Sequence, residues 1–167
     1  LRGDDRKRSP RMMEVPRAVK RASGIAPNFL WDKTAYTLGV TEGEGKRTAQ
    51  EHATFQERHA EWLAGTDDPG LLALLRFLDA WDPQSFQPPL WPEEMRDQNL
   101  VFCLERERLA GVLIHDRPAA RAAWARVVGE TASDPQICLV TGEPGPVARL
   151  HASIKGVWGA QSSGASL

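Results

Sequence analysis

Two stretches, residues 48–64 and 69–81, place residues of one face at the three- and four-residue spacing of an α-helix. Thr48 and Glu51 have the spacing of a capping box and predict the start of a first helix. Asp68 before Pro69 predicts the start of a second helix. The predicted apolar faces carry His52, Phe55, His59, Trp62 and Leu63 in the first helix, and Leu71, Leu74, Leu75, Leu78 and Trp81 in the second. Since only a short turn separates them, the two helices should pack as a hairpin.

Short apolar runs with β-branched residues lie on both sides of this predicted hairpin, and such runs are typical of strands. The predicted strands are residues 12–15, 35–40, 99–104, 111–115, 136–141 and 147–150. The run at 111–115 is the expected partner of the run before it, and Asp116 is expected to cap a third helix that carries Ala120 and Trp124. Strands interrupted by helices without a regular alternation indicate an α+β fold. We expect small, mostly antiparallel sheets, a helical hairpin and a third helix.

The same pattern divides the chain into four segments. They are a basic loop with a short strand at 1–16, a second basic loop with a strand at 17–47, the helical hairpin with a proline-rich loop at 48–98, and strands with one helix at 99–167. A length of 167 residues suits one domain. Because the chain begins at Leu1 rather than at Met and stops at Leu167 without a polar tail, we expect it to be a piece of a longer protein.

Charge is distributed unevenly along the chain, although the net charge is only −1. Residues 1–47 hold 11 Lys and Arg against 6 Asp and Glu, whereas residues 48–135 hold 8 against 15. This asymmetry suggests that the basic end meets a polyanion, with an ordinary solvated loop as the alternative. No apolar stretch approaches the roughly 20 residues of a membrane span, and no signal peptide is visible.

The residues that could support catalysis or metal binding do not assemble into a recognisable site. His52 and His59 are seven residues apart on an apolar face, so core histidines are favoured over zinc ligands, which on a helix sit four apart. The sequence has no Gly-x-Ser-x-Gly nucleophile motif and no phosphate-binding Gly-x-x-x-x-Gly-Lys loop. Cys103 and Cys138 each lie in an apolar segment and are expected as buried free thiols, with a disulfide as the alternative. We therefore expect no catalytic residue, no metal and no cofactor.

The basic loop at residues 17–28 is a better candidate for binding, and its expected partner is nucleic acid. Its candidate contact residues are Arg17, Lys20, Arg21, Ser23, Gly24 and Asn28. Basic side chains contact phosphates, Ser and Asn hydrogen-bond base edges, and glycine lets the backbone approach closely. Asn28 could instead hydrogen-bond its own turn. A second candidate surface consists of Arg149, His151, Lys155 and Gln161. The alternative for this second, glycine-rich segment is that it simply turns the chain.

Two long and unusual blocks of sequence stand in this order along the chain. The first reads KRASGIAPNFLWD at 20–32 and continues as TAYTLGV at 34–40. The second reads CLVTGE at 138–143, followed by ARLHASIKGV at 148–157 and GAQSSGA at 159–165. With their connecting region, these blocks resemble the N-terminal part of the large subunit of the type I-C CRISPR surveillance complex, called Cascade. The resemblance spans nearly the whole chain.

The resemblance implies a non-catalytic DNA-recognition role in a crRNA-guided antiviral complex of the cytoplasm. Such a subunit recognises the protospacer-adjacent motif and helps to open the target duplex, while RNA–DNA pairing reads the sequence. The implied partners are target double-stranded DNA, the crRNA-containing Cascade subunits, a recruited helicase-nuclease and phage anti-CRISPR proteins, with no membrane.

The same resemblance places residues 20–24 where the family reaches the flanking motif in the minor groove. Some relatives have Asn where this chain has Ser23, whose shorter side chain reaches less far. Two alternatives remain open. One is a protein-interaction scaffold whose acidic residues 48–135 dock other subunits without touching DNA, and the other is a metal-dependent nuclease.

Overall fold

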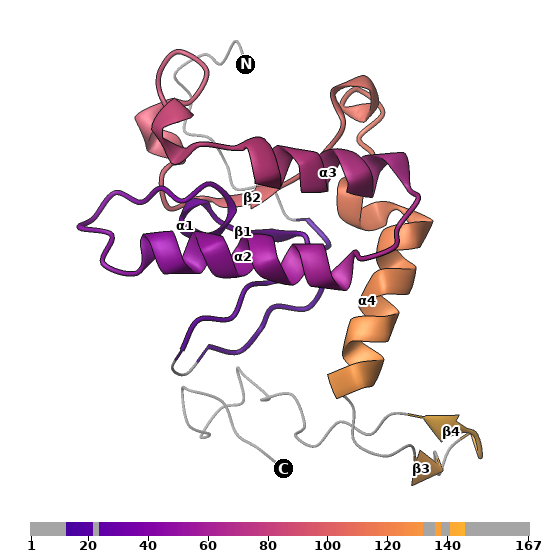
Figure 1. Cartoon of the computed structure of the whole chain (residues 1–167). Coiled ribbons are helices and arrows are strands. Elements are labelled where there is room, and N and C mark those ends of the chain that lie inside the picture. The colour runs from indigo at the N-terminus through magenta and orange to yellow at the C-terminus, as the bar shows by residue number, and fades with distance from the viewer. Residues whose placement is uncertain (1–12, 22–23, 132–135, 138–140, 146–167) are drawn as a thin grey trace, which may run out of the picture. The chain divides into compact units, whose positions relative to one another are not determined.

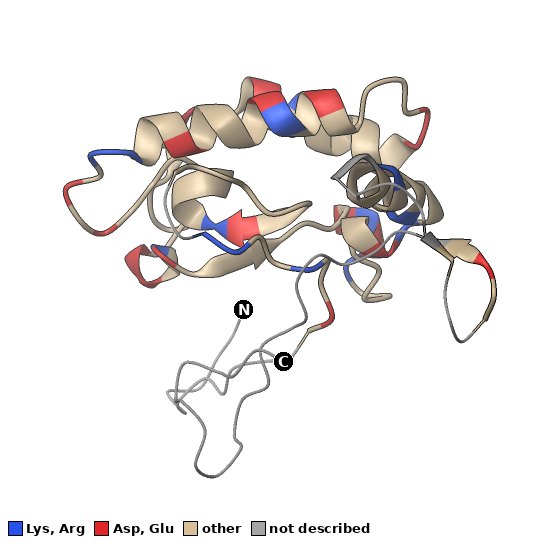
Figure 2. Cartoon of the chain, turned by 90° about the horizontal axis from the view of Figure 1, so that it is seen from below, with Lys and Arg blue, Asp and Glu red and all other residues tan. Residues whose placement is uncertain are grey.

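A computed structural model of the chain describes residues 13–21, 24–131, 136–137 and 141–145. The chain separates into two compact units, Leu1–Trp124 and Ala125–Leu167. In the first unit, helices α2 (Thr48–Trp62) and α3 (Pro69–Ala80) lie on one side, and the strands β1 (Trp31–Lys33) and β2 (Asn99–Val101) lie on the other (Figures 1 and 2). The core lies between these layers.

The predicted helical hairpin is confirmed. Helix α3 begins at Pro69 because the Asp68 carboxylate caps it, accepting hydrogen bonds from the backbone N–H groups of Gly70 at 2.8 Å and Leu71 at 3.0 Å. Helix α2 begins at Thr48, but Arg47 occupies the capping position and no side chain caps it. The predicted capping box is therefore wrong, although the helix starts where that pattern indicated. The fully buried side chains of the hairpin include Phe55, His59, Leu63, Leu71 and Leu78.

Three of the predicted strands are wrong: those at 35–40 and 111–115, and the one whose described residues are 13–15. The first half of the run at 35–40 belongs to the short helix α1 (Thr34–Thr37), which is buried beneath α2. The Thr34 hydroxyl oxygen accepts a hydrogen bond of 2.8 Å from the Asp97 backbone N–H, and this long-range contact favours a turn of helix over an extended chain. The run at 111–115 contains Gly111 at φ +71°, which breaks an extended strand, and it ends in a 3₁₀ turn at Ile114–Asp116.

The partner of β2 is consequently not the run that follows it but β1. The two strands pair antiparallel, with Asp32 opposite Leu100 at the centre of the register. The predicted strand at 136–141 is present as β3 (Gln136–Ile137), which pairs with β4 (Pro144–Gly145), and residues 138–140 lie outside the described residues. Residues 13–15 form no strand, and 147–150 are outside the described part.

The third helix is confirmed as α4 (Pro118–Thr131), with Ala120 buried. Asp116 lies in the preceding 3₁₀ turn, two residues before the helix, so it does not cap α4. The expectation of buried thiols is wrong for Cys103, which is exposed, because β2 ends at Val101 and leaves Cys103 beyond the strand. Cys138 lies outside the described residues.

In the described residues, four α-helices and small antiparallel strand pairs make the fold α+β, as predicted. None of the helices in the described residues is long and apolar enough to cross a membrane.

Candidate nucleic-acid interface

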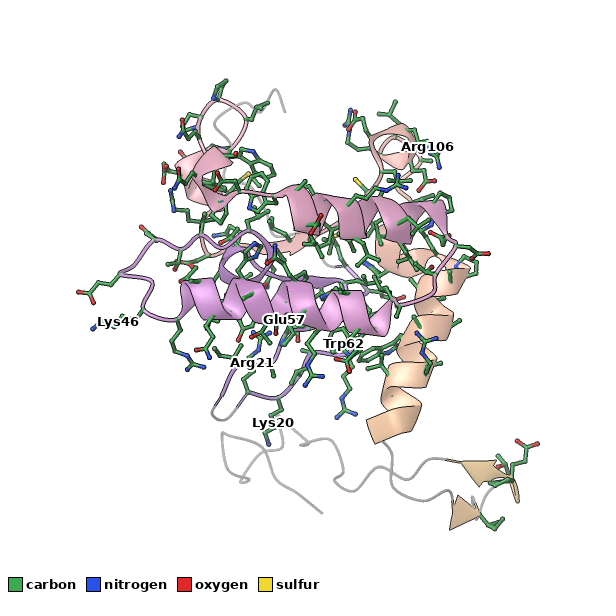
Figure 3. The ribbon with its side chains drawn as sticks, viewed as in Figure 1. Lys20, Arg21, Lys46, Glu57, Trp62 and Arg106 are labelled. Carbon is green, nitrogen blue, oxygen red and sulfur yellow. The ribbon has the colours of Figure 1, made fainter. Side chains whose placement is uncertain are left out.

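The basic loop at residues 17–28, which we call the basic loop from here on, extends from the β1 side of the first unit, below α2 in the view of Figure 1. Arg17, Lys20 and Gly24 are exposed in it. Lys20 points away from α2 in Figure 3. Gly24 has φ +88°, and a Cβ atom built on it would meet no atom within 4 Å. Two basic side chains and an open backbone position are thus presented to solvent.

The base of the basic loop is organised by one buried carboxylate, that of Asp32 at the centre of β1. Asp32 is 1% exposed. Its two oxygens accept hydrogen bonds from the Asn28 backbone N–H at 2.9 Å, from the Lys33 backbone N–H at 2.8 Å and from both terminal nitrogens of Arg21. A carboxylate can be buried in this way because its charge is paired and its lone pairs are occupied.

Arg21 differs from the other basic residues of the loop because its guanidinium faces the protein. Its Nε atom donates to the Ala26 carbonyl oxygen at 2.6 Å, its terminal nitrogens bind Asp32 in a bidentate pair, and its Cζ lies 4.2 Å from the centre of the Tyr36 ring. Only 28% of the Arg21 side chain is exposed. The residue predicted to contact a phosphate is therefore bound to side chains of its own chain.

Asn28 also faces inward. It is 4% exposed, and its Oδ1 atom accepts a hydrogen bond of 2.8 Å from the Val19 backbone N–H, across the neck of the loop. This geometry favours the alternative in which Asn28 hydrogen-bonds its own turn over direct reading of a base. The Trp31 Nε1 atom also donates a hydrogen bond of 2.8 Å to the Pro16 carbonyl oxygen. This second contact joins the residue just before the loop to the segment that follows it.

A buried histidine supports the point where the loop enters the core. Leu30 has φ +62°, an uncommon backbone conformation for a residue other than glycine, and its N–H donates to His59 Nε2 at 2.9 Å. His59 Nδ1 in turn donates to the Phe55 carbonyl oxygen at 2.7 Å. Burial lowers the pKa of His59 to about 4, partly opposed by that hydrogen bond to Phe55. Near neutral pH the imidazole is therefore uncharged and can accept the Leu30 hydrogen bond.

Further basic residues flank the loop. Lys33 and Arg47 are exposed, and they line an open pocket together with Arg21 and Gly24. The Asp97 carboxylate in the same pocket accepts hydrogen bonds from the Thr41 hydroxyl and from a neighbouring backbone N–H. Glu51 lines this pocket as well, so the flank carries both basic and acidic side chains.

Sequence reasoning identified the loop but missed the roles of Asp32, Tyr36 and the flanking Lys33, and it predicted His59 as a core residue without its hydrogen bond to Leu30. In the sequence, Asp32 is an acidic residue that directly follows the apolar residues Phe29, Leu30 and Trp31. That position does not reveal that Arg21 pairs with it. Of the predicted contact residues, Ser23 and the second surface of Arg149, His151, Lys155 and Gln161 lie outside the described residues.

The predicted core role of the helix α2 histidines is confirmed, since His52 is 6% exposed and His59 is fully buried. Within the described residues, no group of three or more His, Cys, Asp or Glu side chains is placed to hold a metal ion.

The chain matches one family of CRISPR-associated proteins. The model of the family described as CRISPR-associated protein (Cas_Csd1) matches residues 1–167. The chain therefore belongs to the Cas_Csd1 family of CRISPR-associated proteins, and this confirms the resemblance carried by its two sequence blocks. Membership associates the protein with CRISPR antiviral defence and with other components of a CRISPR-associated complex. A comparison with curated proteins gives no match.

Proposed function

We propose that this protein is a non-catalytic DNA-recognition component of a type I-C Cascade complex, and that its basic loop contacts the duplex beside the target sequence. There it would recognise the protospacer-adjacent motif and help to open the duplex, in the cytoplasm, while the crRNA held by other subunits reads the sequence. Cutting would belong to a recruited helicase-nuclease.

The observation that carries this proposal is the contrast between the outer and inner sides of the basic loop. Arg17 and Lys20 face solvent, whereas the residues at the base are tied to the core through Asp32 and His59. Exposed cations on a fixed backbone can contact phosphates at defined positions, and phosphate contacts set the register in which bases are read. The exposed Gly24 would let the backbone approach the groove.

The test is DNA binding by the assembled complex carrying Arg17→Ala and Lys20→Ala together. Each phosphate contact contributes about 0.9 to the slope of log K against log salt concentration, so the double variant should lose roughly 2 from that slope and bind more weakly. Lys46→Ala with Arg106→Ala is the matched control, because both residues are exposed and lie outside the basic loop, Lys46 before α2 and Arg106 in a 3₁₀ turn (Figure 3). Equal slopes for the two double variants would refute the role of the basic loop.

One observation favours a second function, that of a scaffold for other subunits. A cavity of about 400 Å³ opens in the predominantly acidic segment and is lined mainly by apolar side chains, including Phe77, Trp91, Met95 and Leu100. Apolar surface of this kind often marks protein contacts. Under this alternative, Phe77→Ser would release a subunit from the complex, and the double variant of the basic loop would bind DNA normally. Phage anti-CRISPR proteins would be further partners for such a surface.

A further inference from the structure

Two neighbouring basic residues of the basic loop have opposite orientations, and this difference carries an inference that rests on the proposed function. Lys20 is exposed and points away from the protein (Figure 3). Arg21 is held by Asp32, by the Ala26 carbonyl oxygen and by the face of Tyr36. In sequence the two residues look equivalent, but in the structure only Lys20 has its charge directed toward solvent.

The contacts around Asp32 close the loop into a ring. Arg21 and Asp32 join positions 11 residues apart, and Asn28 is bonded both to the Asp32 carboxylate through its backbone N–H and to the Val19 N–H through its side chain. Removing the Arg21 guanidinium from this ring would leave a carboxylate that is 1% exposed without its counter-charge. An unpaired buried carboxylate is strongly unfavourable, so the ring resists transfer of Arg21 to an external phosphate.

We infer that Arg21 is a positioning residue rather than a phosphate ligand: its bidentate pair with Asp32 holds the basic loop in the conformation in which Arg17, Lys20 and Gly24 meet the target duplex. A loop held in its binding conformation loses less conformational entropy when it binds. When a loop occupies that conformation for only a fraction of the time, its apparent Kd rises by the inverse of the fraction.

Asp32→Asn separates the two roles because they predict changes of opposite sign. If Arg21 positions the loop, the neutral amide weakens the pair, the loop opens, and duplex binding by the assembled complex weakens; occupancy of one tenth would raise the Kd about tenfold. The salt slope would not change, since the phosphate contacts are the same. If Arg21 is a phosphate ligand restrained by Asp32, the substitution frees it, so binding becomes tighter and the slope steepens by about 0.9.

Arg21→Lys is the second variant and keeps the inference testable if Asp32→Asn does not fold, because Arg21 is partly exposed whereas Asp32 is fully buried. Lysine keeps the positive charge but cannot make the bidentate contact. We expect weaker binding with an unchanged salt slope. Near-normal affinity in Arg21→Lys, or tighter binding with a steeper slope in Asp32→Asn, would overturn the inference.

A readout independent of DNA separates failure of this inference from failure of the proposed function. Tryptic cleavage after Lys20 should accelerate in Asp32→Asn, because an open loop fits a protease better than a closed one. An unchanged cleavage rate means that the pair does not hold the loop, whatever happens to DNA binding. Conversely, if Lys20→Ala with Arg17→Ala leaves the salt slope intact, the proposal that the basic loop contacts DNA fails. The cleavage rate of Asp32→Asn still decides whether Arg21 and Asp32 hold the loop.

Discussion

His59 makes the stability of the first unit depend on pH in a calculable way. Its pKa falls from the ordinary value of 6.5 to about 4 because the ring is buried, with the hydrogen bond to Phe55 acting in the opposite direction. Between these two values the unfolded chain binds a proton at His59 and the folded chain does not. Acidification through this window therefore stabilises the unfolded state, and His59 removes stability as the pH falls.

The size of the effect follows from the shift. A fall of the His59 pKa from 6.5 to about 4 corresponds to about 3 kcal/mol of unfolding free energy, lost progressively from pH 6.5 down to pH 4. Protonation also removes the acceptor at Nε2, which leaves the buried N–H of Leu30 without its partner. Opening should therefore begin at Leu30, where the basic loop enters the core.

The measurement compares wild type with His59→Gln by urea unfolding at a series of pH values. Trp62, whose ring centroid lies 5.2 Å from that of His59, is a nearby fluorescent reporter. At neutral pH the variant should be less stable, because the pair of hydrogen bonds to Leu30 and Phe55 is disturbed. The difference should shrink by about 3 kcal/mol between pH 7 and pH 4, because glutamine does not titrate and all other titrating groups are common to both proteins. A difference that stays constant over this range would refute the account of His59.

Two further predictions concern the start of α3. Gly70→Ala should reduce the unfolding free energy by about 1–2 kcal/mol, because its Cβ would lie 2.6 Å from Nε of Arg117, which must then move. Gly43→Ala is the control, since its Cβ would meet nothing within 4 Å, and its effect should stay within about 0.5 kcal/mol. Asp68→Ala should reduce the unfolding free energy by about 1–2 kcal/mol, because it removes the cap of α3 and the 2.7 Å contact with Arg117. Asp67→Ala, at the exposed neighbouring position, is the control and should have little effect. Thermal unfolding measures all four, and equal melting temperatures within either pair would contradict the corresponding prediction.

The pKa of Asp68 adds a pH dependence to the second of these predictions. Burial raises it, but hydrogen bonds from Arg117 and from the helix N–H groups outweigh burial, so the pKa is lowered overall. A carboxylate with a lowered folded-state pKa contributes stability above its ordinary pKa and loses it as the pH falls through the folded value. The destabilisation in Asp68→Ala should accordingly diminish in acid.

The parts of the fold that could be predicted are those specified by neighbouring residues. The Asp68-Pro69 start, the apolar face of α2 and the third helix depend on contacts within a few positions along the chain, and all three are present. The strand predicted at 35–40 failed because the competing contacts come from far along the chain. Asp97 bonds to Thr34 across 63 positions, and short segments follow such contacts more than their own propensity.

The sequence by itself determined that a basic loop lies beside an apolar anchor and that the chain belongs to a CRISPR-associated family, because both are carried by the order of residues. Only the tertiary structure decided the orientation of each side chain in that loop. Lys20 and Arg21 are adjacent and alike in charge, yet one faces solvent and the other a carboxylate on β1. The buried position of Asp32 arises when β1 pairs with β2, about 70 residues further along, and no local pattern encodes that pairing.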